Sequence, residues 1–162
     1  MDDPSQPVAY MERTRLYYHA LGYKADYQWA RHDDAPFTRL AKPLAQSRIA
    51  LLTTASPLDG SNIDAMKRRH VWSAPVDPAP ESLATDDLAW DRESTHTKDR
   101  ESFLPLAAAA KLAAEGHFAG LTPHFHGAPS EYSIRKTNTQ DGPEILARLR
   151  QDGADAAILC AI

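Results

Sequence analysis

Three short runs of consecutive apolar residues constrain the fold of this chain more than any other feature. They cover residues 48–54, 117–122 and 154–162. A strand that a parallel sheet buries on both faces has this pattern, whereas a half-exposed strand alternates polar and apolar residues. Helical patterns at residues 103–116 and 141–152 precede the second and third runs. This order predicts an α/β fold: a three-layer, open, mostly parallel sheet built from βαβ units with right-handed crossovers.

We expect a single α/β domain over residues 1–162, because this is the usual length of one domain. Residues 1–47 are predicted to hold an N-terminal helix and an ordered connection. The helical pattern covers residues 8–21. The connection that follows has aromatic residues without a regular period, and we expect Trp29 and Phe37 to pack it.

Residues 48–162 are predicted to hold the βα units and one long irregular insert at about 56–100. The insert contains four prolines and many charged residues. A stretch of this length without regular structure is uncommon inside a domain and is usually functional or mobile. Short elements are predicted within it at residues 65–72 and 83–90.

Composition excludes several classes of protein. The 18 basic and 22 acidic residues give a formal net charge of -4, which provides no general attraction to nucleic acid or to an anionic membrane. No apolar run is long enough for a transmembrane helix, and the acidic first residues lack the apolar core of a signal peptide. A single cysteine, Cys160, excludes an internal disulfide. We therefore expect a cytoplasmic protein.

Hydroxyl-bearing residues follow the first predicted strand. Open parallel sheets bind ligands at the carboxyl ends of their strands, where hydroxyls and backbone N–H groups hold carboxylates. Thr53, Thr54 and Ser56 are therefore predicted to bind a substrate carboxylate. The alternative is that the threonines simply end the strand.

Two histidines, His124 and His126, lie two residues apart in a predicted loop after the second strand. If this segment is extended, both imidazoles lie on one face of the backbone. With Asp99, His96 or Cys160 they would supply three or four metal ligands. A lone pair of histidines is a weak metal signal, so we assign no metal site and keep solvated or hydrogen-bonded loop histidines as the alternative.

His96 and Asp99 precede the predicted helix at 103–116. This pair has the residue types of a general base and the carboxylate that orients it. The alternative is a polar turn in which the side chains satisfy backbone groups. Cys160 lies inside the last apolar run, which favours a buried small side chain over a reactive thiol.

The chain resembles the selenoprotein B subunits of the glycine/sarcosine/betaine/D-proline reductase family over most of its length, from about Tyr17 onward. The resemblance lies in the collinear order of many short segments rather than in one motif. These segments are Leu21-Gly22-Tyr23, Trp29-Ala30, Pro36-Phe37-Thr38, Lys42-Pro43-Leu44, Ser47-Arg48-Ile49-Ala50-Leu51, Thr53-Thr54-Ala55, His96, Asp99, Phe103-Leu104-Pro105-Leu106, Leu112, Glu115-Gly116, Gly120-Leu121, His124, Gly127 and Gly153-Ala154-Asp155-Ala156.

The resemblance implies a redox centre with selenocysteine or cysteine directly after the last strand, where the given sequence stops at Ile162. Cys160 does not take the place of that centre. One explanation is a short family member that binds without reducing. The other, which we favour, is a reading frame ended at a UGA codon that the organism reads as selenocysteine. No cofactor is then expected within this chain.

For full-length members the resemblance implies reductive cleavage of a C–N bond next to a carboxylate, with a selenolate as nucleophile. Because the sequence departs from the family around residues 86–100 and after His126, the substrate class is not fixed as glycine. The expected partners are a small carboxylate substrate and other reductase subunits, with a homo-oligomer as an open alternative. The candidate catalytic residues are His96, Asp99 and His124, and the candidate substrate-binding residues are Thr53, Thr54, Ser56 and His126.

Two other functions stay open on the sequence. One is a metal-dependent enzyme built on His124, His126 and a carboxylate. The other is a non-catalytic module that binds a small carboxylate.

Overall fold

The computed structural model describes residues 9–26, 33–34, 38–86, 93, 96–130 and 133–161. The chain divides into two compact units, residues 1–37 and 38–162. The first unit contains the helix α1 (Tyr10–Ala20), which confirms the predicted N-terminal helix, and none of its side chains is buried within the unit. Gly22 follows it with a φ of 90°. Trp29 and Phe37 lie outside the described residues.

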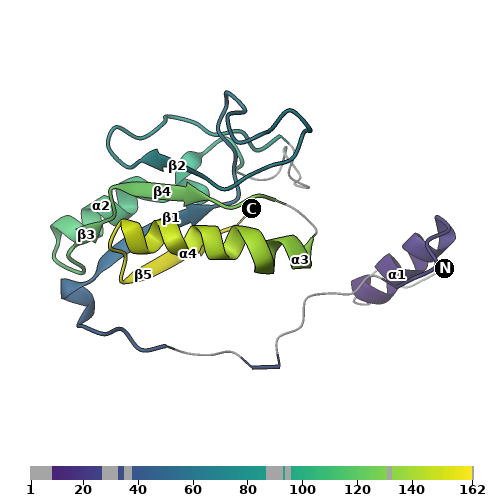
Figure 1. Ribbon diagram of the computed structural model, residues 1–162, viewed down its shortest axis with the longest axis horizontal. Helices are drawn as coiled ribbons and strands as arrows, with labels where there is room; N and C mark the ends of the chain where they lie inside the picture. Colours follow the sequence, from purple (N-terminus) through teal and green to yellow (C-terminus); the bar gives the residue numbers. More distant parts are fainter. Residues whose placement is uncertain are drawn as a thin grey trace. The chain divides into compact units, whose positions relative to one another are not determined.

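The second unit is built around a five-stranded mixed sheet, which confirms the predicted α/β class (Figure 1). Its strands are β1 (Arg48–Thr53), β2 (Trp72–Pro75), β3 (Gly120–Leu121), β4 (His124–Gly127) and β5 (Ala156–Cys160). β1 is central: β3 and β4 pair in parallel with its two ends, and β5 pairs in parallel along its length. β2 is antiparallel to β4 and forms one edge.

Helices cover both faces of the sheet, which gives the predicted three layers (Figure 1). The longer helices are α2 (Leu106–Ala114) and α4 (Gly142–Gln151), and α4 continues from α3 (Ile134–Lys136) through a π-helical turn, Thr137–Asp141. Leu106 and Ala109 of α2 pack into the core with Leu51 and Phe125. α4 lies on the opposite face. Among the described residues, no helix has both the length and the apolar character needed to cross a bilayer.

Trp72 joins the edge strand β2 to the core. Its ring packs edge-on against Phe125 of β4, with ring centroids 5.4 Å apart. The indole N–H donates a hydrogen bond to the carbonyl of Ala55 at 3.2 Å. Gly127 leaves room for the ring, because a Cβ atom at this position would overlap the indole nitrogen. The sequence predicted neither β2 nor this contact.

Three predicted elements need correction. The segment that starts at His124 is the strand β4 and not a loop, and the predicted strand at 117–122 shrinks to β3 because the chain bends at Pro123. The prediction of a buried last strand was wrong, since Ile158 and Leu159 of β5 are 50% and 56% exposed. β5 is apolar yet pairs only with β1 among the described strands, so within this unit it is an edge strand.

Candidate functional site

The carboxyl ends of three parallel strands lie level in the sheet. Thr53 of β1 is in register with Gly127 of β4 on one side and with Cys160 of β5 on the other. The loops that follow these strands therefore begin at the same edge. In open α/β sheets this edge is the usual place for a ligand.

The predicted hydroxyl residues after β1 lie at this edge. Thr53 is fully buried, and its hydroxyl oxygen accepts a hydrogen bond from the N–H of Ala55 at 3.2 Å. Its carbonyl accepts one from the N–H of Ala128, which follows β4, at 2.8 Å. The Ser56 hydroxyl is also buried and accepts from the amide of Asn62 at 3.2 Å. The hydroxyls of Thr53 and Ser56 therefore hold the loop in place, while Thr54 is half-buried beside them.

His124 and His126 lie on one face of β4, the face covered by α4. His126 is 1% exposed, and its Nδ1 lies 2.8 Å from the hydroxyl oxygen of Ser73 on β2. Arg148 of α4 donates to the same oxygen at 2.7 Å. Because the hydrogen bond from Arg148 occupies a lone pair of the Ser73 oxygen, the Ser73 hydroxyl is well placed to donate its own proton to Nδ1 of His126. This arrangement favours the His126 tautomer with its proton on Nε2.

Asp152, directly after α4, links the two histidines. Its carboxylate oxygens both lie 3.1 Å from Nδ1 of His124. One of them lies 3.4 Å from Nε2 of His126, but this buried nitrogen makes no hydrogen bond. Together with Gln151 these side chains line an open groove of about 210 Å³. The described residues include no group of three or more His, Cys, Asp or Glu side chains arranged to hold a metal ion.

Burial lowers the pKa of His126 below its ordinary value of 6.5, with smaller lowering contributions from the charges of Arg148 and His124 and an opposing one from Asp152. The unfolded chain then binds a proton at a higher pH than the folded protein does. The contribution of neutral His126 to folding stability is therefore fully present above the pKa that this histidine has in the unfolded chain. It is lost as the pH falls below that value.

We predict that wild-type stability declines as the pH is lowered through about 6.5, and that His126→Asn makes this decline shallower. Asparagine keeps an acceptor for Ser73 but does not titrate. Chemical denaturation at several pH values measures the slope. The control is His117→Asn, since the His117 side chain is 59% exposed and its pairing with Glu115 contributes little. If stability depends on pH equally steeply in wild type and His126→Asn, the pH dependence does not come from His126.

His96 and Asp99 lie in a turn that leads into a 3₁₀ turn, Arg100–Ser102, before α2. Asp99 accepts a hydrogen bond from the N–H of Glu101, and the carbonyl of His96 accepts one from the Ser102 hydroxyl. Both residues are exposed. The turn contacts α2, which covers the other face of the sheet from the β4 histidines. The structure thus brings His124 and His126 together and places His96 and Asp99 elsewhere.

Cys160 is half-buried near the end of β5, and burial raises the pKa of its thiol. A thiol with a raised pKa contains little thiolate at neutral pH. We therefore predict that iodoacetamide alkylates Cys160 more slowly than it alkylates glutathione at the same pH, as measured by mass spectrometry over time. Faster alkylation would show an activated cysteine instead.

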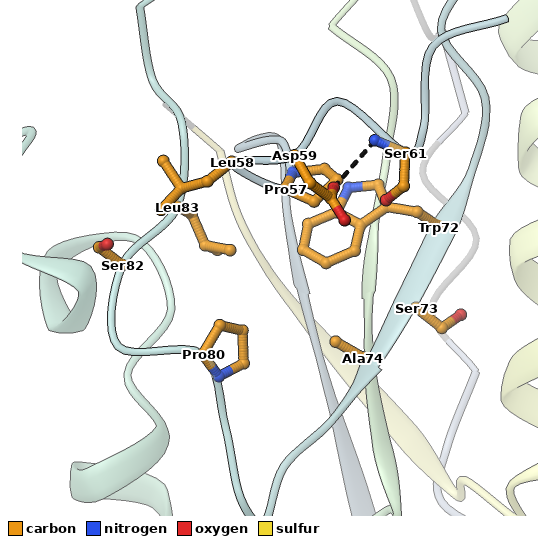
Figure 2. A pocket seen from close by; sticks show the side chains of 10 residues that line it. All are labelled: Pro57, Leu58, Asp59, Ser61, Trp72, Ser73, Ala74, Pro80, Ser82 and Leu83. Carbon is orange, nitrogen blue, oxygen red and sulfur yellow. Dashed lines mark hydrogen bonds between the residues drawn. The ribbon is translucent and has the colours of Figure 1, made fainter.

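A second cavity, of about 370 Å³, lies where the loops after β1 and β2 meet (Figure 2). Its lining residues are Pro57, Leu58, Asp59, Ser61, Trp72, Ser73, Ala74, Pro80, Ser82 and Leu83. They come from the segment predicted as an irregular insert, and none of them was predicted as a site residue. A signal was available: a loop with Pro, Asp and Gly directly after a buried strand marks a ligand-binding edge.

Comparison of the chain with protein-family models, with curated proteins and with solved structures finds no match.

Proposed function

We propose that this chain is the substrate-binding part of a selenoprotein B-like reductase that cleaves a C–N bond next to a carboxylate. The observation that carries the proposal is that β1, β4 and β5 end in register at one edge of the sheet, at Thr53, Gly127 and Cys160. A residue that follows β5 emerges at the same edge as the hydroxyl-bearing loop after β1. The resemblance implies a selenocysteine or cysteine at that point.

In the proposed reaction a selenolate attacks the carbon next to the substrate carboxylate. A C–Se bond forms, the C–N bond breaks, and the amine leaves with the bonding pair and takes up a proton. A selenolate suits this step because it is ionised at neutral pH and is a stronger nucleophile than a thiol. The residues of this chain bind and orient the substrate: Thr53 and Ser56 fix the loop after β1, and that loop receives the carboxylate.

A second candidate function is the binding of a small carboxylate without turnover, in the groove under α4. The observation that favours it is the unsatisfied Nε2 of His126. A buried polar group without a partner is costly, and a ligand oxygen that displaced the Asp152 carboxylate, 3.4 Å from this nitrogen, would remove that cost. Arg148 adds positive charge beside this nitrogen, although it also pairs with Glu144.

The two functions predict different binding sites. We would titrate the ¹⁵N-labelled protein with glycine, sarcosine, betaine and D-proline, with acetate as a carboxylate that lacks an amine. The reductase proposal predicts shifts of backbone signals in residues 54–58 and 128–130. Binding in the groove predicts shifts at Ser73 and His126 instead. A folded protein that shows neither set of shifts with any of the five compounds contradicts both proposals.

The DNA beyond codon 162 provides an independent test. The reductase proposal predicts an in-frame UGA codon followed within a few codons by a cysteine codon. Growth with ⁷⁵Se would then label a product longer than 162 residues. A UAA or UAG codon with no downstream frame contradicts the selenoprotein part of the proposal.

A further inference from the structure

The cavity of about 370 Å³ beside Trp72 has fixed walls. Ser56 and Ala84 exchange two backbone hydrogen bonds, of 3.0 and 2.8 Å, and these join the loop after β1 to the loop after β2. The hydrogen bond from Trp72 to Ala55 holds the indole ring beneath the first loop. The cavity volume falls within the range that is usual for small-molecule sites.

The described lining of this cavity is mostly apolar and carries a single negative charge. Among the described residues that line it, Pro57, Leu58, Pro80 and Leu83 are apolar and only Asp59 has a charged side chain. Asp59 and the Trp72 indole both line the cavity, and in Figure 2 the side chains of Leu83 and Pro80 lie on its other side. The lining therefore combines one negative charge with an aromatic ring and apolar walls.

Asp59 carries its negative charge at neutral pH. Its Oδ1 accepts a hydrogen bond from the Ser61 N–H at 2.9 Å. This bond, followed by one from the Ser61 side chain, lowers the pKa of the carboxyl below its ordinary value. The Ser73 side chain does not add to the cavity chemistry, since it points away toward α4 (Figure 2).

We propose that this cavity binds a small organic cation through an alkylammonium group, with Asp59 as counter-ion and the Trp72 indole as an aromatic contact. Quaternary ammonium groups are recognised by aromatic faces, with tryptophan the strongest of them. A hard metal ion does not fit this lining, because Ca²⁺ and Mg²⁺ require several oxygen ligands and the cavity offers one carboxylate. A carboxylate ligand does not fit either, since none of the described residues that line the cavity is basic.

The inference does not depend on the reductase reaction, because cation binding is measured without turnover. The probes are choline and its neutral isostere 3,3-dimethylbutan-1-ol, which has the same shape without the charge. The readout is the indole N–H signal of Trp72 in ¹⁵N NMR spectra, assigned with the variant Trp72→Phe. The signals of the other two tryptophans are internal references. We expect choline to shift the Trp72 signal saturably and the neutral isostere to bind at least roughly threefold more weakly.

Asp59→Asn tests the counter-ion. Asparagine retains an acceptor for the Ser61 N–H, so the loop is expected to stay folded. We expect choline affinity to fall by roughly threefold or more, with the affinity for the neutral isostere unchanged. Glu115→Gln is the charge-matched control, because Glu115 is exposed at the end of α2 and does not line the cavity.

Three results would overturn the proposal. The first is the absence of any saturable shift of the Trp72 signal with choline. The second is equal affinity for choline and the neutral isostere, which would show a purely apolar pocket. The third is an equal loss of choline affinity in Asp59→Asn and Glu115→Gln, which would show only the effect of net charge.

Discussion

Gly127→Ala is expected to destabilise the second unit strongly. The added methyl group would overlap the Trp72 indole, and the nearest atoms are the rigid ring atoms rather than the end of a flexible side chain. The ring cannot move away easily, because it is hydrogen-bonded to Ala55 and packed against Phe125. Overpacking of a core costs about 1–3 kcal/mol and occasionally more, and we expect the upper end of this range. Chemical denaturation of purified protein measures it.

Gly116→Ala is the matched control. Gly116 has a φ of 82°, so alanine there is strained, but its Cβ would meet no atom within 4 Å. A left-handed conformation costs an alanine about 1–2 kcal/mol. We therefore expect a smaller and measurable loss. If Gly127→Ala is no worse than Gly116→Ala, the close packing of Trp72 against β4 is wrong.

Phe125→Ala is expected to lower the free energy of unfolding by about 3–5 kcal/mol, the usual cost of removing a buried phenylalanine ring. Phe125 is 0% exposed at the centre of the core and also supports the Trp72 ring. Leu146→Ala on α4 is the control, since Leu146 is 46% exposed and its truncation leaves no enclosed cavity. Equal losses in the two variants would contradict the position of the core between the sheet and α2.

The central strand was predicted well because its sequence carries a complete signal. β1 is covered on both faces, so every residue from Ile49 to Thr53 is buried and the apolar run is continuous. β5 has an equally apolar sequence, but composition does not show whether a strand has one neighbour or two. β2 was missed because four residues that include Ser73 and Pro75 lack a strand pattern. Only the pairing with β4 makes this segment extended.

The candidate site was predicted in part for similar reasons. The strand-end rule found Thr53, Thr54 and Ser56 at the carboxyl edge, and the spacing of His124 and His126 placed both imidazoles on one face. The partners of these histidines were missed, because Ser73 and Asp152 are distant from them in sequence. One local signal was available: Arg148 and Asp152 are four residues apart, which places both on the same side of a helix.

The most direct test of the reductase account is a single-turnover measurement of C–N bond cleavage. The protein is produced with everything its reading frame encodes, reduced to the selenolate, and mixed with glycine, sarcosine, betaine or D-proline in turn. The account predicts one equivalent of cleavage per selenocysteine with at least one of these compounds. Cleavage is measured as released amine for the first three and, for D-proline, whose amine stays in the ring-opened product, as a covalent selenium adduct by mass spectrometry. Folded, selenium-containing protein that cleaves none of them would contradict it.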